Sequence, residues 1–194
     1  MSAGTEAPED RTTQVSLLGR FASLWGVLGA LSLLGSAIWR LTPIALEPFT
    51  VGPALTGFQW VLYVGFIVFN AHAEGYRGFQ KGYSPRVVAR SLYLAEHPKP
   101  LHVLLAPAFC MGLFYATKKR MIVGWVLITV IVGVIAAVRQ LDQPWRAIID
   151  GGVVVGLAWG AIAVVVFYVR GLMGRPPLRD PELPEGAPKP SWMR

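Results

Sequence analysis

Charged residues are scarce in this sequence. Only 15% of its 194 residues are charged, 54% are hydrophobic, and the mean hydropathy is +0.49. Soluble domains carry about 25% charged residues, so this composition excludes an ordinary soluble domain. The chain is therefore expected to be an integral membrane protein.

Cysteine and the common catalytic motifs are missing or nearly so. The one cysteine, Cys110, excludes an internal disulfide and a cysteine metal cluster. The sequence has no phosphate-binding glycine loop, no His-Glu-x-x-His pair and no Gly-x-Ser-x-Gly elbow. We therefore expect no cofactor and favour a non-enzymatic role. The net charge of +7 comes from lysines and arginines that flank apolar segments, which accounts for it without nucleic acid.

Long apolar runs are what the sequence has in abundance. A bilayer core of about 30 Å needs about 20 helical residues. The stretches that approach this length are 21–39, 58–73, 101–117, 121–138 and 148–168. They are continuously apolar, whereas barrel strands alternate, so we predict an all-α, polytopic membrane helix bundle over residues 17–170.

The segments outside these runs are polar or rich in proline. The polar N-terminus, residues 1–16, and the proline-rich C-terminal tail, residues 171–194, are predicted to be disordered. Residues 40–57, between the first two apolar runs, contain three prolines and are expected to form an irregular loop.

The number of crossings depends on residues 101–117. If all five stretches cross, lysine and arginine divide evenly, nine on each side, and the positive-inside rule gives no orientation. If 101–117 enters and returns without crossing, fifteen of the 18 fall on one side and three on the other. Pro107 favours such a bend, while the length of the apolar run favours a plain crossing. The sequence leaves four and five spans open, with a cytoplasmic N-terminus in the four-span case.

A short amphipathic helix is predicted at residues 84–97, between the second and third apolar stretches. It begins with a Ser-Pro pair, which fits an N-cap and a first helical position. At about 100° per residue the apolar side chains gather on one face, and the opposite face carries Arg86, Arg90 and His97. We expect this helix to lie in the membrane interface, where these three residues bind anionic lipid headgroups or a partner protein.

Two groups of polar residues lie at the ends of apolar stretches. One spans the end of the second stretch with spacings of i, i+4 and i+7, and the other spans the start of the fifth stretch and includes an i, i+4 pair of opposite charge. Polar groups at membrane depth are costly and face protein or water, so these residues either anchor and cap helix ends or line a polar path. The candidates are Asn70, Glu74, Arg77, Arg139, Arg146 and Asp150.

The fifth stretch also carries a repeat of small residues. Gly152, Gly156 and Gly160 recur every four residues and so line one helix face, where another backbone can approach closely. The neighbour is either another helix of the same chain or a helix of a second copy or partner subunit. For metal or haem, the only candidates are His72 and His102, which lie at the end of the second stretch and at the start of the third. No haem-sized gap of small residues lies beside them, so no metal is expected.

Two functions remain compatible with these features. The first is a non-enzymatic scaffold, accessory subunit or assembly factor for another membrane complex, using the glycine face and the amphipathic helix for contact. The alternative is an oligomeric transporter or lipid-handling protein with a polar path near Glu74, Arg77, Arg139 and Asp150. Arginine outnumbers lysine, and alanine, glycine and proline are frequent, which is typical of a GC-rich bacterial genome. The bacterial inner membrane is then the expected location.

Overall fold

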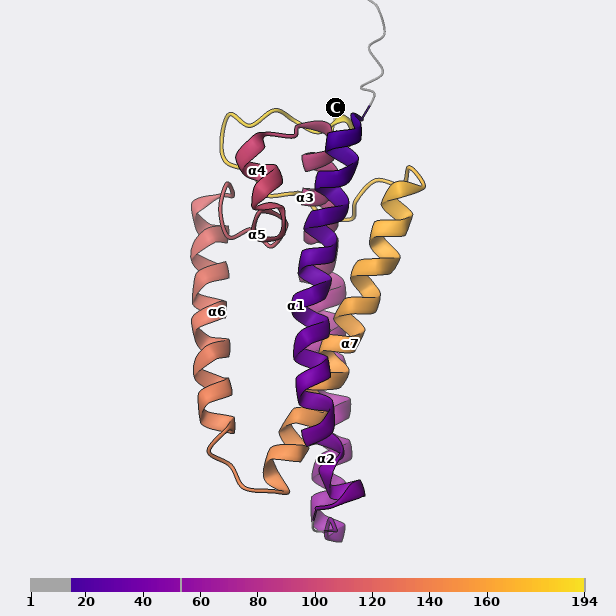
Figure 1. The fold of residues 1–194 in the computed structure, drawn as a ribbon, viewed down its shortest axis with the longest axis vertical. Helices are drawn as coiled ribbons and strands as arrows, with labels where there is room; N and C mark the ends of the chain where they lie inside the picture. The colour runs from indigo at the N-terminus through magenta and orange to yellow at the C-terminus, as the bar shows by residue number, and fades with distance from the viewer. Residues whose placement is uncertain (1–14, 53, 194) are drawn as a thin grey trace, which may run out of the picture.

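The protein is a bundle of long helices with a folded cap at one end (Figure 1). The computed structural model describes residues 15–52 and 54–193, and within them all regular structure is helical, as the sequence predicted. The elements are α1 (Leu17–Thr50), α2 (Gly57–Asn70), the π-helix η1 (Ala71–Tyr83), α3 (Ser84–Glu96), α4 (Pro100–Leu104), α5 (Ala106–Cys110), α6 (Lys118–Val138), α7 (Trp145–Leu172) and the 3-10 helix η2 (Ser191–Met193). Three of these, α1, α6 and α7, are long and apolar enough to cross a membrane. Most of the predicted N-terminal segment 1–16 lies outside the described residues.

Helix α1 is longer than the apolar stretch 21–39 from which it was predicted. It begins at the Ser16 N-cap, whose Oγ accepts a hydrogen bond from the Gly19 amide, and it continues through Pro43 and Pro48. A proline has no amide hydrogen, so Pro48 leaves the carbonyl of Ile44 without its usual helical donor. The side-chain amide of Gln143 donates to that carbonyl at 3.4 Å. Gln143, just before α7, therefore supplies a donor for the carbonyl that Pro48 leaves open in α1.

The elements α2, η1 and α3 join end to end into one rod from Gly57 to Glu96. The rod begins with a capping box between Thr56 and Gln59, and both internal junctions keep right-handed helical backbone angles. The predicted helix 84–97 is present as α3, and its apolar face packs inside the protein. Val88, Ala89 and Leu94 are almost fully buried, because α1, α7 and α5 pack around this end of the rod.

Residues 101–117 do not form one helix. They fold into α4 and α5, of five residues each, followed by a turn that leads to Lys118 at the start of α6. Pro107 lies in the first turn of α5 and packs against Gly29 of α1. Both short helices lie at the end of the bundle where α6 begins (Figure 1). We call α3, α4, α5 and the turn 111–117 the cap.

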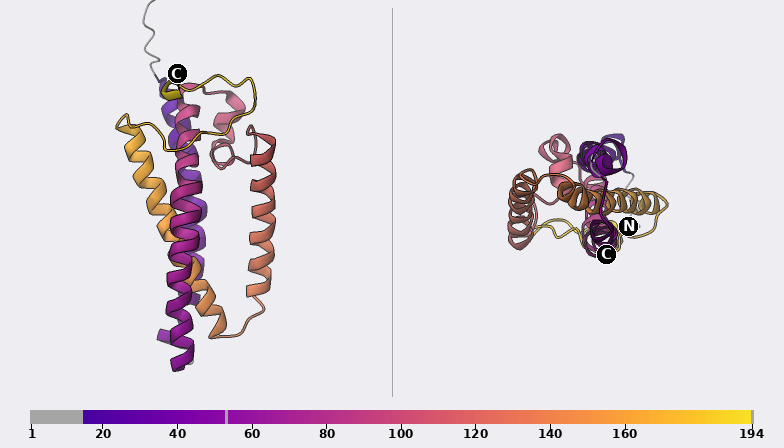
Figure 2. Two further views of the ribbon diagram at one scale, coloured as in Figure 1. Left: turned by 180° about the vertical axis from the view of Figure 1, so that it is seen from behind. Right: turned by 90° about the horizontal axis from the view of Figure 1, so that it is seen from below.

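The proline-rich tail was expected to be disordered, yet residues 175–193 follow a defined, mostly irregular path over the cap (Figure 2). Pro181 and Pro190 are fully buried, and Leu183 packs against the core of the bundle. The backbone amide and the hydroxyl of Ser191 both donate to the carboxylate of Glu96, at the end of α3. Prolines prevent a regular helix here, but polar bonds and buried rings still order the segment.

Helix α6 stands apart from the other long helices (Figures 1 and 2). Its N-terminal end is held to the cap, where the Trp125 indole donates to the Leu113 carbonyl at 3.2 Å. Gly124, against Leu113, is the only buried residue of the helix. In the middle, Ile131 and Ile135 are 48% and 49% exposed although they lie on the same face as Gly124. The apolar surface of α6 is therefore left uncovered by the described part of its own chain.

Candidate functional sites

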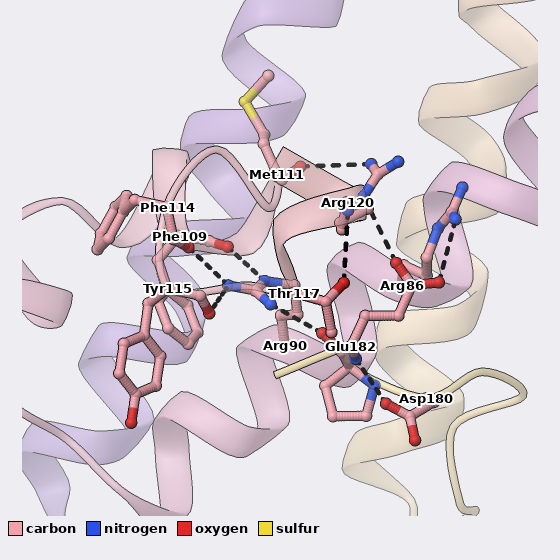
Figure 3. Close-up of polar contacts among 11 residues, drawn as sticks. Arg86, Arg90, Phe109, Met111, Phe114, Tyr115, Thr117, Arg120, Asp180 and Glu182 are labelled. Carbon is pink, nitrogen blue, oxygen red and sulfur yellow. Dashed lines mark hydrogen bonds and ion pairs between the residues drawn. The ribbon is translucent and has the colours of Figure 1, made fainter. Parts of the chain in front are cut away.

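A buried arginine lies at the centre of the cap (Figure 3). Arg90, on α3, is only 2% exposed. Its Nε donates to the carbonyl oxygen of Phe109 at 2.5 Å, and its Nη1 donates to that of Pro181 at 2.7 Å. Its Nη2 donates to the carbonyls of Phe114 and Tyr115, both at 3.0 Å. One side chain thus ties α3 to α5, to the turn before α6 and to the tail.

The electrostatics of Arg90 fit this structural role. Its guanidinium carbon lies 4.3 Å from the centre of the Phe109 ring, a cation–π arrangement. Burial lowers the pKa of Arg90 to about 10, so the group stays protonated at neutral pH. We expected Arg90 to bind lipid headgroups or a partner protein; instead its donors bind backbone carbonyls of its own chain.

Beside Arg90, a carboxylate connects two further arginines (Figure 3). Glu182 of the tail lies 3.5 Å from Arg86 of α3 and 3.7 Å from Arg120 of α6. Its backbone carbonyl accepts from the amide of Thr117 at 2.9 Å, just before α6 begins. Arg86 is therefore partly engaged within the chain, although its Nε is buried without a hydrogen-bond partner among the described residues.

The histidines lie in different neighbourhoods. His97 stacks on Tyr93 at 4.7 Å between ring centres, and His102 stacks on Phe109 at 4.9 Å. His72 is exposed and contacts Tyr76, so the structure does not bring it to His102. In the described part of the chain, no three His, Cys, Asp or Glu residues are grouped to hold a metal ion. Burial, with smaller contributions from Lys99 and Arg90, lowers the pKa of His102.

The glycine face of α7 packs against the rod of the same chain. Added Cβ atoms at Gly152 and Gly156 would lie 2.6 Å from the Asn70 side-chain nitrogen and 2.6 Å from a Glu74 carboxylate oxygen, respectively. Gly160 faces the Phe79 ring in the same way. The helices that pack closely against this glycine repeat are therefore α2 and η1. Gly75 of η1, which was not among the predicted packing glycines, faces Trp159 of α7.

The six polar candidates do not form one path. Asn70 and Glu74 both face α7, and the Asn70 amide donates back to the Phe66 carbonyl at 2.9 Å. Asp150 pairs with Arg146, one turn earlier on its own helix, at 3.6 Å. Arg77 and Arg139 are exposed. A transport route lined jointly by these residues therefore has no support in the geometry.

No known protein family, curated protein or solved structure matches this chain. The arginine centre was missed because the helical wheel placed Arg90 on a polar face together with Arg86. A signal was available: small or apolar residues, Ala89, Ser91 and Leu94, surround Arg90 in the sequence, as expected for a buried segment.

Proposed function

We propose that this protein is a non-enzymatic accessory or scaffold subunit that attaches to another membrane protein through α6. The observation that carries this proposal is the exposure of α6. Its outer face, opposite Gly124, presents Val126 and Val130, both 55% exposed, and Gly133, with no neighbouring atom near its missing side chain. Small and β-branched residues of this kind allow close helix packing in a bilayer.

The proposal includes a four-span topology. Helices α1, α6 and α7 would cross together with residues 58–73 of the rod, while the short α4 and α5 remain on one side. Fifteen of the 18 lysines and arginines then lie on the side of the cap, which the positive-inside rule makes cytoplasmic. The three on the other side are Arg40, Arg139 and Arg146. A bacterial inner membrane is the location that we propose.

The polar groups of the cap support a structural role. Arg90 and Glu182 hold four segments of the chain together through the bonds described above. A cap of this kind fixes where α6 begins while its apolar length stays uncovered. The protein is therefore built to present one transmembrane helix in a fixed position.

Site-specific photo-crosslinking in intact cells tests this function. A photoreactive amino acid replaces Val130 on the outer face of α6, and in a matched variant it replaces Val164, which is completely buried in α7. We expect the first variant to form an adduct with one defined membrane protein and the second to react only within its own chain. If positions 126, 130 and 133 all give no protein adduct, the proposal is wrong.

A further inference from the structure

Helix α7 ends on the cap side of the bundle in a turn built on Gly174 (Figure 1). Gly174 has a φ of 79°, a left-handed conformation that glycine adopts without strain. Its amide donates to the carbonyl of Gly171 at 3.0 Å, and the amide of Arg175 donates to the carbonyl of Arg170 at 3.1 Å. These two bonds define a Schellman motif, which brings the side chains of Arg170 and Arg175 next to each other.

A turn of this kind usually brings two apolar side chains into contact. Here both positions are arginines, and both line one shallow pocket. The rest of its lining is apolar and comes from α3, α7 and the tail: Pro85, Val88, Phe167, Pro176, Pro177 and Leu178. We call this the α7 pocket.

The two arginine charges in the α7 pocket are not neutralised by the protein. No carboxylate lines the pocket, and neither arginine forms an ion pair within the described part of the chain. The C-terminus of a helix favours cations, but its dipole supplies only about half a negative charge against these two positive charges. Like charges held side by side repel each other, and an anion between them removes that cost.

The pocket lies at the depth of lipid headgroups in the four-span arrangement. Helix α7 has 28 residues, which is about 42 Å of helix, whereas the hydrocarbon core of a bilayer is about 30 Å thick. With Trp145 at the far membrane boundary, where tryptophan is favoured, the hydrocarbon core ends about 20 residues later, near Val165. Arg170 then lies about 7 Å beyond the hydrocarbon, among the headgroups.

The size of the pocket limits what can enter it. Its cavity measures about 10 Å³, the space of one water molecule, and Arg175 is exposed beside it. One oxygen atom of a larger anion fits this space, and the rest of the anion lies outside, within reach of Arg175. The planar fork of donors on arginine matches two oxygens of a phosphate group.

We propose that the α7 pocket binds a phosphate group between the guanidinium groups of Arg170 and Arg175. At headgroup depth, the expected source is the phosphate of an anionic phospholipid. Its acyl chains would follow Val166, which lies one turn before Arg170 on α7 and is 48% exposed. The site involves α7, α3 and the tail, so it goes beyond the proposed function of α6.

Thermal unfolding of the full chain, purified in mild detergent and titrated with phosphatidylglycerol, tests the site. We expect the lipid to raise the melting temperature, and the size of the shift gives the affinity. Arg170→Gln/Arg175→Gln should bind at least about tenfold more weakly, because each cation beside an anionic group contributes about fivefold. The matched control, Lys118→Gln/Lys119→Gln, removes two exposed cations at the cap and should leave the affinity unchanged.

A charge reversal keeps the test informative where the double variant is unstable. Arg175→Glu places a carboxylate beside Arg170, so it should unfold at the wild-type temperature or higher without lipid. The same variant should lose the stabilisation by phosphatidylglycerol. Sodium phosphate, added without lipid at constant ionic strength, separates the two sources of phosphate. If it stabilises the wild-type chain as strongly as the lipid does, the ligand is a soluble phosphate compound.

The proposal is overturned by any of three results. Neither phosphatidylglycerol nor sodium phosphate stabilises the wild-type chain, Arg170→Gln/Arg175→Gln keeps the wild-type affinity, or the Lys118→Gln/Lys119→Gln control loses as much affinity as that variant. Val130 takes no part in the site. A missing crosslink at Val130 with phosphate binding intact would therefore count against the proposed function alone.

Discussion

Arg90 donates a hydrogen bond to the carbonyl of Pro181, a residue 91 positions further along the chain, at 2.7 Å. The two residues belong to α3 and to the proline-rich tail, which share no secondary structure. A buried charge is costly unless its hydrogen bonds are satisfied, and here backbone carbonyls take that role instead of a carboxylate. The cap therefore depends on this one guanidinium.

Replacing Arg90 should open the cap. Arg90→Ala removes a donor from the carbonyls of Phe109, Phe114, Tyr115 and Pro181, of which Phe109 keeps its bond from the Gly112 amide, and buried unpaired polar groups cost about 1–3 kcal/mol each. We expect the chain to lose at least about 3 kcal/mol of stability, seen as a lower melting temperature in detergent. Arg90→Lys should restore little, because an ammonium lacks the planar fork of donors. Unchanged protease resistance of residues 175–190 would contradict this expectation.

Glu182 should matter far less than Arg90. Its carboxylate is 37% exposed and lies 3.5–3.7 Å from its two arginines, so each ion pair is partly screened by solvent. Glu182→Gln should cost about 1 kcal/mol or less in thermal unfolding, and less still at high salt. Glu185→Gln, at an exposed position in the same tail, is the control. A loss comparable with that of Arg90→Ala would show that the ion pairs, and not the carbonyl bonds, hold the tail.

Helix packing on α7 can be tested at one glycine. A Cβ at Gly156 would lie 2.6 Å from a Glu74 carboxylate oxygen, so Gly156→Leu forces α7 away from η1. We expect a loss of about 1–3 kcal/mol, as for other overpacked sites, measured by thermal unfolding in detergent. Gly133→Leu on α6 has open space around it and should be nearly neutral. Equal effects at the two positions would argue against a tight α7–η1 contact.

Reporter fusions decide the topology. Reporters that are active on only one side of the membrane are fused after Arg90 and after Arg120. Because α4 and α5 are too short to cross, we expect same-side signals from both fusions. Opposite-side signals would show that residues 101–117 cross and that there are five spans. A fusion after Gln140 reports from the other side in the four-span arrangement and serves as the control.

The stability of the cap should fall in mild acid. Burial lowers the pKa of His102 in the folded protein, so the unfolded chain takes up a proton more readily. Stability is therefore complete above the unfolded pKa of about 6.5 and decreases as the pH falls toward the folded pKa. His102→Phe should remove this part of the pH dependence when melting is followed from pH 8 to pH 5. The exposed His72, changed in the same way, should leave it intact.

The apolar stretches 121–138 and 148–168 predicted α6 and α7 well, because long uninterrupted apolar runs have few alternatives to a helix. The all-helical class followed from the same signal. The prolines were less informative: Pro43 and Pro48 were expected to make a loop, yet α1 continues through both, and Gln143, far along the chain, donates to the carbonyl that Pro48 leaves open. A hydrogen-bond donor so far along the chain cannot be predicted from the local sequence.

The cap was least predictable for the same reason. A helical wheel shows which residues share a face but not what covers that face. The arginine face of α3 is covered by the tail, and the composition of the tail had predicted disorder. The glycine repeat on α7 showed where a helix could approach, and only the structure identified α2 and η1 as the neighbours.

The bond between Arg90 and Pro181 also imposes an order on how the protein is made. The ribosome synthesises α3 first, and α6 and α7 are both made before residue 181. During that interval the guanidinium of Arg90 lacks one of its final acceptors. The cap therefore closes only after α6 and α7 have been synthesised, so a closed cap marks a nearly finished chain.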